Sequence, residues 1–254
     1  MQNKLAEIVT EVGKEINRNK KLLIVGGRWH GNQLKTKADM FAHKLLTSKL
    51  LSLNNLPIIS EEDNNSHKIL RPKQYWIIDP IDDTRSFVDG FPGWVVQVAL
   101  VIDGKPKASA IFAPDIDLLY TAQEGAGAYC NGKKLIVSEE SHDRKILIDN
   151  YHEPRGIANN IMKGMSCTNY VESGSISLKI CRIADGTADM FIKDVTIRDW
   201  DVAAPMLVLE EAGGFMLQYN GSLFNLSNNF DKNGLIVARS KKLINSILEF
   251  LDEI

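Results

Sequence analysis

The sequence contains little cysteine. Its 254 residues include only Cys130, Cys167 and Cys181. An odd number of widely spaced cysteines argues against a disulfide framework, and a cysteine-based metal centre would need closely spaced pairs. We therefore expect three reduced thiols.

The chain also lacks an excess of charge of one sign. Lysine and arginine total 30, aspartate and glutamate total 32, and the formal net charge is −2 at pH 7. Proteins that bind nucleic acid or anionic membranes through charge usually present a basic surface. The balance predicts no nucleic-acid partner, so any phosphate group must be bound by a local site.

Long hydrophobic runs, repeats and low-complexity segments are missing as well. No apolar run approaches the ~18 residues that a membrane span needs, and no signal-peptide pattern opens the chain. We expect a soluble, cytoplasmic protein without a membrane span. A chain of 254 residues is long enough for one or two domains of roughly 150 residues each.

Apolar residues recur at helical spacing in some segments and form short runs bounded by turn residues in others. Helices are predicted around 5–16 and over 37–53, 176–184, 201–211 and 243–251. Strands are predicted over 57–60, 75–79, 94–102, 107–112, 118–120, 128–130, 145–148, 188–192 and 235–238. Helices that alternate with strand pairs predict a layered, mixed α and β architecture. The polar stretch 138–143 divides this single unit into two halves, about 1–140 and 141–254.

The most informative stretch is W-I-I-D-P-I-D-D-T-R-S-F, from Trp76 to Phe87. We expect a buried strand that ends at Asp79, because Pro80 cannot donate to a sheet ladder. Asp82 or Asp83 before Thr84 is typical of a helix N-terminus, whose free N–H groups favour an anion. Carboxylates would repel that anion unless divalent cations lay between them, and Mg²⁺ combines carboxylate with phosphate oxygens. An Asp-rich turn that only caps a helix remains the alternative.

Further acidic residues lie at predicted element ends. Asp39 falls in the first turn of the 37–53 helix, where it favours the helix dipole. Residues 61–63, Glu-Glu-Asp, follow a strand and are by themselves typical of a solvated loop. Asp201 opens the 201–211 helix, a start that Pro205 supports because proline is tolerated in a first turn.

Four ordered motifs resemble those of the inositol monophosphatase superfamily. D-P-I-D-D-T-R-S-F resembles its signature D-P-[IL]-D-G-T-x-x-F, and W-D-V-A-A followed by E-A-G-G resembles its second signature. K-A-D and S-E-E complete the order, so the resemblance runs from about Thr36 to Gly214. P-I-I-S-E-E-D, the pair Ala113-Pro114 and S-L-K-I-C are most similar to bacterial 3′(2′),5′-bisphosphate nucleotidases.

The resemblance implies a layered αβαβα sandwich and a Mg²⁺-dependent phosphomonoesterase that uses two or three ions. It also implies a small phosphorylated substrate and a monomer or homodimer. Thr84 would act with Glu61 to orient and deprotonate the attacking water. By matching positions, the metal ligands would be Glu61, Asp79, the Ile81 carbonyl, Asp82 and Asp201. The substrate contacts would come from Asp83, Thr84, Arg85, Lys179 and Asp201.

Within the superfamily, the resemblance to nucleotidases implies 3′-phosphoadenosine 5′-phosphate as the substrate. Lys193 is nearest to the position at which inositol monophosphatases carry a glutamate, and a cation there suits a second phosphate. His152 stands where nucleotidases carry S-R-S-H, and it alone of that motif is kept. G-S-I-S-L-K has the spacing of the inositol group's G-S-A-A-L, so an inositol monophosphatase remains the alternative.

Two departures from the family pattern bear on the metal site. Asp83 stands where the family has glycine, and Gly31, Gln33 and Leu34 replace a nucleotidase loop, D-x-S-P-V-T, that supplies an aspartate. We hypothesise that the Asp83 carboxylate substitutes for that aspartate at a third ion; capping a helix and repelling substrate are the alternatives.

A further alternative belongs to another class of function. The chain could be a degenerate homologue that binds a phosphorylated ligand or a protein without turnover. Retention of all the metal carboxylates and of Thr84 argues against this, because a pure binder does not need a threonine that activates water.

Overall fold

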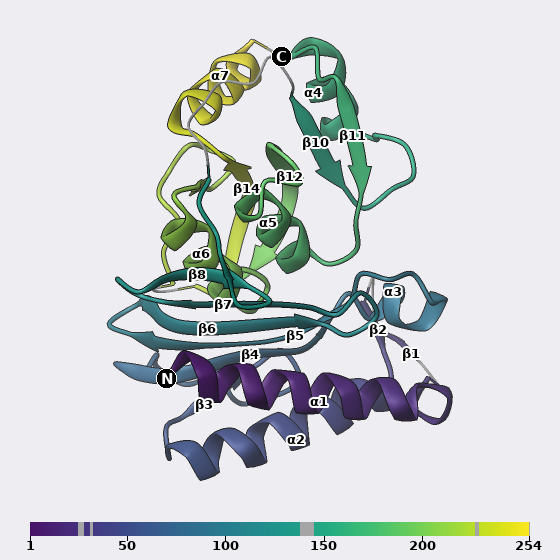
Figure 1. Cartoon of the computed structure of the whole chain (residues 1–254), viewed down its shortest axis with the longest axis vertical. Coiled ribbons are helices and arrows are strands. Elements are labelled where there is room, and N and C mark those ends of the chain that lie inside the picture. Colours follow the sequence, from purple (N-terminus) through teal and green to yellow (C-terminus); the bar gives the residue numbers. More distant parts are fainter. Residues whose placement is uncertain (25–27, 31–32, 138–144, 227–228, 254) are drawn as a thin grey trace.

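The computed structural model describes residues 1–24, 28–30, 33–137, 145–226 and 229–253. Two β-sheets alternate with three layers of helices along the long axis of the molecule (Figure 1). The predicted αβαβα sandwich is confirmed. The predicted division between two halves falls on residues 138–144, which lie outside the described residues.

The first layer consists of α1 (Gln2–Leu23) and α2 (Lys37–Leu53), which cover one face of the larger sheet (Figure 1). Leu5, Val9, Val12 and Ile16 recur at helical spacing on α1, and all are fully buried. They pack with apolar residues of α2 and of the sheet into one core cluster. A short hairpin, β1 (Arg28–His30) and β2 (Gln33–Lys35), lies between the two helices in the chain.

The larger sheet has seven strands in chain order. They are β3 (Ile58–Ser60), β4 (Gln74–Asp82), β5 (Val95–Ile102), β6 (Lys105–Ala113), β7 (Leu118–Gln123), β8 (Gly127–Cys130) and β9 (Lys133–Lys134). The β3–β4 pair is parallel and the others are antiparallel. A short helix, α3 (Thr84–Asp89), follows β4. The sequence pair Asn131-Gly132 favours a type I′ turn, and both residues have the positive φ that this turn requires.

The second sheet has five strands in the order β11-β10-β12-β14-β13. These are β10 (Ile146–Asp149), β11 (Asn169–Glu172), β12 (Met190–Arg198), β13 (Phe215–Leu217) and β14 (Asp231–Ala238). Helices α5 (Ile176–Ala184) and α6 (Asp199–Ala212) lie between the sheets, and α4 (Ile157–Gly164) and α7 (Lys241–Asp252) cover the outer face (Figure 1). Each helical layer has its own apolar cluster.

Strand β4 does not end at Asp79, so that prediction is wrong. The strand continues through Pro80 to Asp82. Its ladder to β3 stops at Ser60 opposite Ile78, and its ladder to β5 is irregular between Asp79 and Asp82. Pro80 therefore lies where no ladder hydrogen bond is required, which is the place in a sheet where proline is tolerated.

Helix α6 begins at Asp199, two residues before the predicted start, and Pro205 lies inside it. Proline has no N–H, so it cannot donate to the carbonyl four residues earlier. That carbonyl belongs to Asp201, and it accepts a hydrogen bond of 2.8 Å from the Ser177 hydroxyl. A side chain on α5 thus replaces the missing helical bond, and α6 can run through its proline.

Strand β12 is also longer than the predicted 188–192 segment, reaching from Met190 to Arg198. Its second part is held by pairing with β14, for example Arg198 opposite Asp231, beyond a register shift after Lys193. The extension carries the chain directly into α6. In the described segments, every helix is too short or too polar to cross a membrane.

Two glycines join the halves of the molecule by backbone contact. Gly93 precedes β5, Gly174 precedes α5, and the Ser175 N–H donates to the Gly93 carbonyl at 2.9 Å. A Cβ atom on Gly174 would lie 2.5 Å from the Gly93 oxygen and 2.6 Å from its Cα. Because both surfaces are backbone, neither can move aside as a side chain could.

We therefore predict that Gly174→Ala destabilises the protein by about 1–3 kcal/mol, the usual cost of overpacking, as measured by denaturant unfolding. Gly214→Ala is the matched control, because its added Cβ meets mainly the flexible side chain of Leu209. Equal effects of the two substitutions would contradict a backbone-limited contact.

Candidate active site

Carboxylates from distant parts of the chain converge at one end of β4. Asp79 and Asp82 lie on β4, and Glu61 follows β3, the parallel neighbour of that strand. Asp201 lies in the first turn of α6. Burial raises the pKa of Asp79 well above its usual range, and the charges of Glu61, Asp82 and Asp201 raise it further. The structure thus brings these predicted residues together.

The other two aspartates have the same environment. The pKa of Asp201 is raised first by burial and then by the Asp82 and Glu61 carboxylates. Burial also raises the pKa of Asp82, although hydrogen bonds from Ser177 oppose the shift. Acids that destabilise one another's ionised forms in a buried site are the setting in which a bound cation is most favourable.

All three aspartates accept a backbone hydrogen bond through one oxygen, and for Asp79 it is Oδ1 that accepts from the Ile81 N–H at 3.1 Å. Asp82 Oδ2 accepts from the Ser177 N–H at 3.0 Å, and Asp201 Oδ2 accepts from the Arg198 N–H at 2.8 Å. In the part of the chain that the structure describes, no three acidic, histidine or cysteine side chains already form a metal-binding group.

The chemistry of the donor set fits Mg²⁺. Its members are carboxylate oxygens and a backbone carbonyl, that of Ile81, which is held in β4. These are hard oxygen ligands, the kind that Mg²⁺ prefers. The Thr84 hydroxyl lies 3.4 Å from the Ile81 carbonyl oxygen, so the threonine is directly beside this set.

Thr84 has a partner that the sequence pattern does not reveal. Its hydroxyl donates to Asp39 Oδ1 at 2.8 Å, while Asp39 Oδ2 accepts from the N–H and hydroxyl of Thr36 in a capping box. Asp39 is buried, and burial raises its pKa. The T-x-x-D pattern signals the cap, which favours the helix dipole as predicted, but nothing local signals the contact with a residue 45 positions away.

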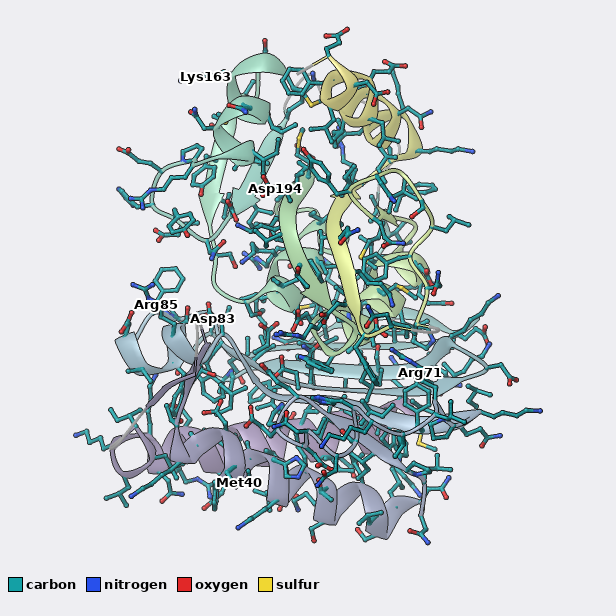
Figure 2. The ribbon with its side chains drawn as sticks, turned by 180° about the vertical axis from the view of Figure 1, so that it is seen from behind. Met40, Arg71, Asp83, Arg85, Lys163 and Asp194 are labelled. Carbon is teal, nitrogen blue, oxygen red and sulfur yellow. The ribbon has the colours of Figure 1, made fainter. Side chains whose placement is uncertain are left out.

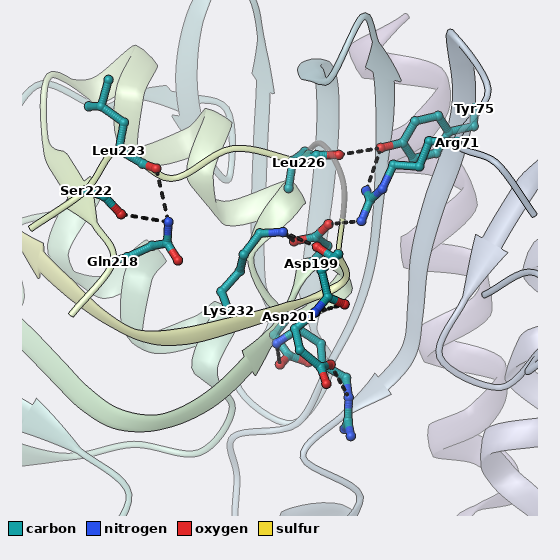
Figure 3. A network of polar contacts seen from close by, with 12 residues as sticks. Arg71, Tyr75, Asp199, Asp201, Gln218, Ser222, Leu223, Leu226 and Lys232 are labelled. Carbon is teal, nitrogen blue, oxygen red and sulfur yellow. Dashed lines mark hydrogen bonds and ion pairs between the residues drawn. The ribbon is translucent and has the colours of Figure 1, made fainter. Parts of the chain in front are cut away.

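The start of α6 is fixed by a buried ionic network (Figure 3). Asp199 is fully buried between Arg71 and Lys232. Arg71 also donates to the Tyr75 hydroxyl at 3.0 Å, and Tyr75 donates to the Leu226 carbonyl at 3.4 Å. Two cations from separate segments thus hold the residue that lies two positions before Asp201.

The Asp83 side chain caps α3. Its backbone has φ 71°, a left-handed conformation that aspartate tolerates better than most residues. Oδ1 accepts from the Ser86 N–H at 3.0 Å and Oδ2 accepts from the Ser86 hydroxyl at 2.5 Å. This is the geometry of the capping alternative, not of the hypothesised metal ligand.

Arg85, in the first turn of α3, points its side chain into solvent (Figure 2) and pairs with Asp89 at 3.4 Å.

Two lysines lie near this site on the side of the second sheet. Lys179 of α5 is fully buried and donates to the Gly174 carbonyl. Burial lowers its pKa to about 8, although Asp83 and Asp149 oppose the shift. Lys193 of β12 pairs with buried Asp149 at 2.5 Å. The two ammonium groups lie 5.2 and 5.9 Å from the centre of the Phe191 ring.

The sequence also singled out His152 and the altered nucleotidase loop. The His152 side chain is 92% exposed and lies 3.4 Å from Glu172, so it is not held toward the carboxylates. Gly31, one of the departures from the nucleotidase loop, lies outside the described residues. Gln33 and Leu34 form part of β2.

Comparison with known proteins identifies the same family along the whole chain. The model of the inositol monophosphatase family matches residues 1–253. Inositol monophosphatase 1 of Bos taurus is 31% identical over 94% of this chain and 88% of its own length. A 3′(2′),5′-bisphosphate nucleotidase, CysQ of Aggregatibacter actinomycetemcomitans, is 32% identical over 77% of this chain and 76% of its own length.

Other matches are shorter in sequence or rest on structure. Inositol monophosphatase 2 of Solanum lycopersicum is 37% identical over 60% of this chain, and the match spans about 60% of the tomato protein's length. The solved structure of the Thermotoga maritima IMPase has a TM-score of 0.83, with 22% identity over 98% of this chain and 95% of its own. At that identity the likeness supports the fold.

We predict that Asp79→Asn stabilises the metal-free protein, because it removes one charge from a group of mutually repelling acids. The same substitution should reduce the rise in melting temperature that Mg²⁺ causes. Thermal unfolding with chelator and with Mg²⁺ measures both effects. A lower metal-free melting temperature together with an unchanged response to Mg²⁺ would refute the proposed cluster.

A second prediction concerns Asp83. Asp83→Gly should leave the Mg²⁺ titration superimposable on that of the original protein, because the carboxylate is engaged with Ser86. Stability should change by about 1 kcal/mol or less, since glycine suits left-handed φ and replaces a cap at small cost. A shift of the titration to higher Mg²⁺ would instead support the metal role.

Proposed function

The chain belongs to the inositol monophosphatase family, whose members are metal-dependent phosphatases, and from that premise we propose that it hydrolyses 3′-phosphoadenosine 5′-phosphate to AMP and phosphate. The convergence of Glu61, Asp79, Asp82 and Asp201 beside Thr84 supports the phosphatase chemistry. The choice of substrate rests on the pair Lys179 and Lys193.

The proposed metal ligands are the carboxylates of Glu61, Asp79, Asp82 and Asp201 and the Ile81 carbonyl. When bound, Mg²⁺ lowers the pKa of water and neutralises charge on the phosphoryl and leaving oxygens. The protein's own contribution is to hold the ligands. Asp79 and Asp82 are fixed on a paired strand, and Asp201 is fixed on a helix whose start is bound by two cations.

We assign two Mg²⁺ ions to this ligand set. A third ion would depend on the loop that contains Gly31, where nucleotidases carry an aspartate and this chain does not.

Thr84 and Glu61 are the residues proposed to prepare the attacking water. Because the Thr84 hydroxyl donates its hydrogen bond to Asp39, the lone pairs of its oxygen remain to accept a hydrogen bond from water. Glu61 takes the proton as the water attacks the phosphorus. The main-chain N–H groups of Asp83, Thr84 and Arg85 hold the phosphate oxygens at the start of α3, and Asp201 also borders the substrate.

The second phosphate of the substrate is proposed to bind Lys179 and Lys193. Lys179 is fully buried and burial lowers its pKa, so an approaching dianionic group would stabilise the charged form of its ammonium group. Lys193 lies on the neighbouring strand and can exchange its pairing with Asp149 for a phosphate. Two cations at one end of the site suit a bisphosphate better than a singly phosphorylated polyol.

An inositol phosphate is the second candidate substrate. Lys193 is paired with Asp149. The carboxylate offsets the positive charge of the lysine, and it lies near the site, where it could accept hydrogen bonds from ring hydroxyls. The Bos taurus and Solanum lycopersicum relatives carry the name inositol monophosphatase. A binder without turnover is the candidate of another class.

We predict that kcat/KM for 3′-phosphoadenosine 5′-phosphate exceeds that for inositol 1-phosphate in the presence of Mg²⁺. Lys179→Met removes the charge and keeps most of the apolar stem, so it should narrow the gap by roughly 1–3 kcal/mol, the cost of a lost charged hydrogen bond. Phosphate release from both substrates measures this difference.

Lys163→Met on α4 is the control, because this lysine is exposed and lies far from Asp83 in Figure 2. A preference for inositol 1-phosphate would overturn the substrate assignment and keep the family chemistry. Equal phosphate release in chelator and in Mg²⁺ would overturn the mechanism, and no release from any phosphomonoester would favour the binding role.

A further inference from the structure

Helix α2 presents two polar side chains toward the site from one face. Asp39 and His43 are four residues apart, so they lie one above the other on the helix. Asp39 accepts a hydrogen bond from the Thr84 hydroxyl. His43 reaches the neighbouring strand, where its Nδ1 lies 2.9 Å from the Ser60 Oγ.

Ser60 is the residue directly before Glu61, and its position is tightly determined. It is fully buried, and its N–H donates to the Ser66 hydroxyl at 3.2 Å. Its carbonyl lies 2.7 Å from His67 Nε2, and its Oγ accepts from the Glu62 N–H at 3.3 Å. Ser60 therefore anchors both ends of the short turn on which Glu61 lies.

We propose that His43 is a positioning residue. Its Nδ1 accepts a hydrogen bond from the Ser60 hydroxyl, and this bond fixes the turn that carries Glu61. The inference rests on the proposed function, because it takes Glu61 as a metal ligand and as the base for water. Helix α2 then positions both residues that prepare the water, Thr84 through Asp39 and Glu61 through His43.

The hydrogen-bonding capacity of a serine hydroxyl supports this arrangement. A hydroxyl has one proton to donate and two lone pairs. Since the Ser60 oxygen already accepts from Glu62, donation to His43 fixes the rotation of the hydroxyl. Burial lowers the pKa of His43, which favours the neutral imidazole with an acceptor nitrogen.

The opposite side of Ser60 is held by His67. This ring stacks on Trp200, with ring centres 4.6 Å apart and planes inclined by 18°. Trp200 is the residue before Asp201, so the same serine is connected to α2 through one histidine and to the start of α6 through the other. His43 supplies the connection to α2, the helix whose Asp39 also binds the Thr84 hydroxyl.

The experiment compares two substitutions of His43 that differ in where they place a polar atom. Asparagine places its amide near the position of Nδ1, whereas glutamine places its amide near Nε2. We expect His43→Gln to raise the Mg²⁺ concentration at the midpoint of thermal stabilisation by about 10- to 100-fold, as is usual when a residue that orients a metal ligand is lost. His43→Asn should restore the midpoint.

Activity gives a second measurement. With saturating Mg²⁺, His43→Gln should lower kcat for phosphate release and leave KM nearly unchanged, because Glu61 prepares the water and does not bind the substrate. Ser60→Ala should reproduce both effects, and the double variant should be no worse than Ser60→Ala alone, since both substitutions remove the hydrogen bond between His43 and Ser60. Ser48→Ala, at an exposed position of α2, is the control for helix stability.

A purely structural role predicts a different outcome. If His43→Gln and His43→Asn lower the metal-free melting temperature alike, and neither moves the Mg²⁺ midpoint, the positioning role is overturned. Additive effects of His43→Gln and Ser60→Ala would also overturn it, and this comparison remains if one variant folds poorly. If the unaltered protein is stabilised by Mg²⁺ but releases no phosphate, the proposed function fails, and the midpoints still decide the positioning role.

Discussion

Repulsion among buried carboxylates is the constraint on which the rest of the site depends. Asp79, Asp82 and Asp201 each have a pKa raised by burial, and Glu61 raises those of Asp79 and Asp201 further. Such a group would separate if its members were on mobile segments. The chain prevents this by placing two on a paired strand and one on an anchored helix. The cost in stability is offset by the three apolar clusters that the helical layers bury against the sheets.

The contact between the two halves of the molecule is polar as well as apolar where it borders the site. Ser177 is the clearest example, because its N–H donates to Asp82 on β4 and its hydroxyl donates to the Asp201 carbonyl on α6. One residue of α5 therefore fixes an acid from each half. The backbone contact of Gly93 with Gly174 sets the separation at which this is possible. Pro205 has a role here too, since without it the Asp201 carbonyl would be occupied within its own helix.

The proposed substrate contacts lie in a different part of the structure from the proposed metal ligands. The carboxylates and Thr84 lie where β3, β4 and α6 meet, whereas Lys179 and Lys193 lie on α5 and β12 around Phe191. A change in the lysines could therefore alter which phosphate ester fits without disturbing the metal ligands. This separation is consistent with relatives of about 30% identity that carry different substrate names on one fold.

The sequence by itself determined the element types, the five-layer class and the family, because apolar periodicity, turn residues and signature motifs are local properties. It placed Asn131-Gly132 in a turn and α2 over residues 37–53, where local preference and burial agree. It misplaced the end of β4 and the start of α6, since a proline was taken to interrupt each element. Only the tertiary structure supplied the irregular ladder at Pro80 and the Ser177 hydroxyl opposite Pro205.

The same holds for the partners of the site residues. Asp39 with Thr84 and His43 with Ser60 are 45 and 17 positions apart, and no local pattern encodes which buried polar groups will meet. The side chain of Asp83 shows the converse case, because its contact is with Ser86, three residues away, and the competing roles assigned to it were long-range. Local chemistry could be read from the chain, whereas the pairing of buried polar groups was decided by the packing of α2, β3, β4 and α6, because most donors and acceptors that a fold buries need a partner.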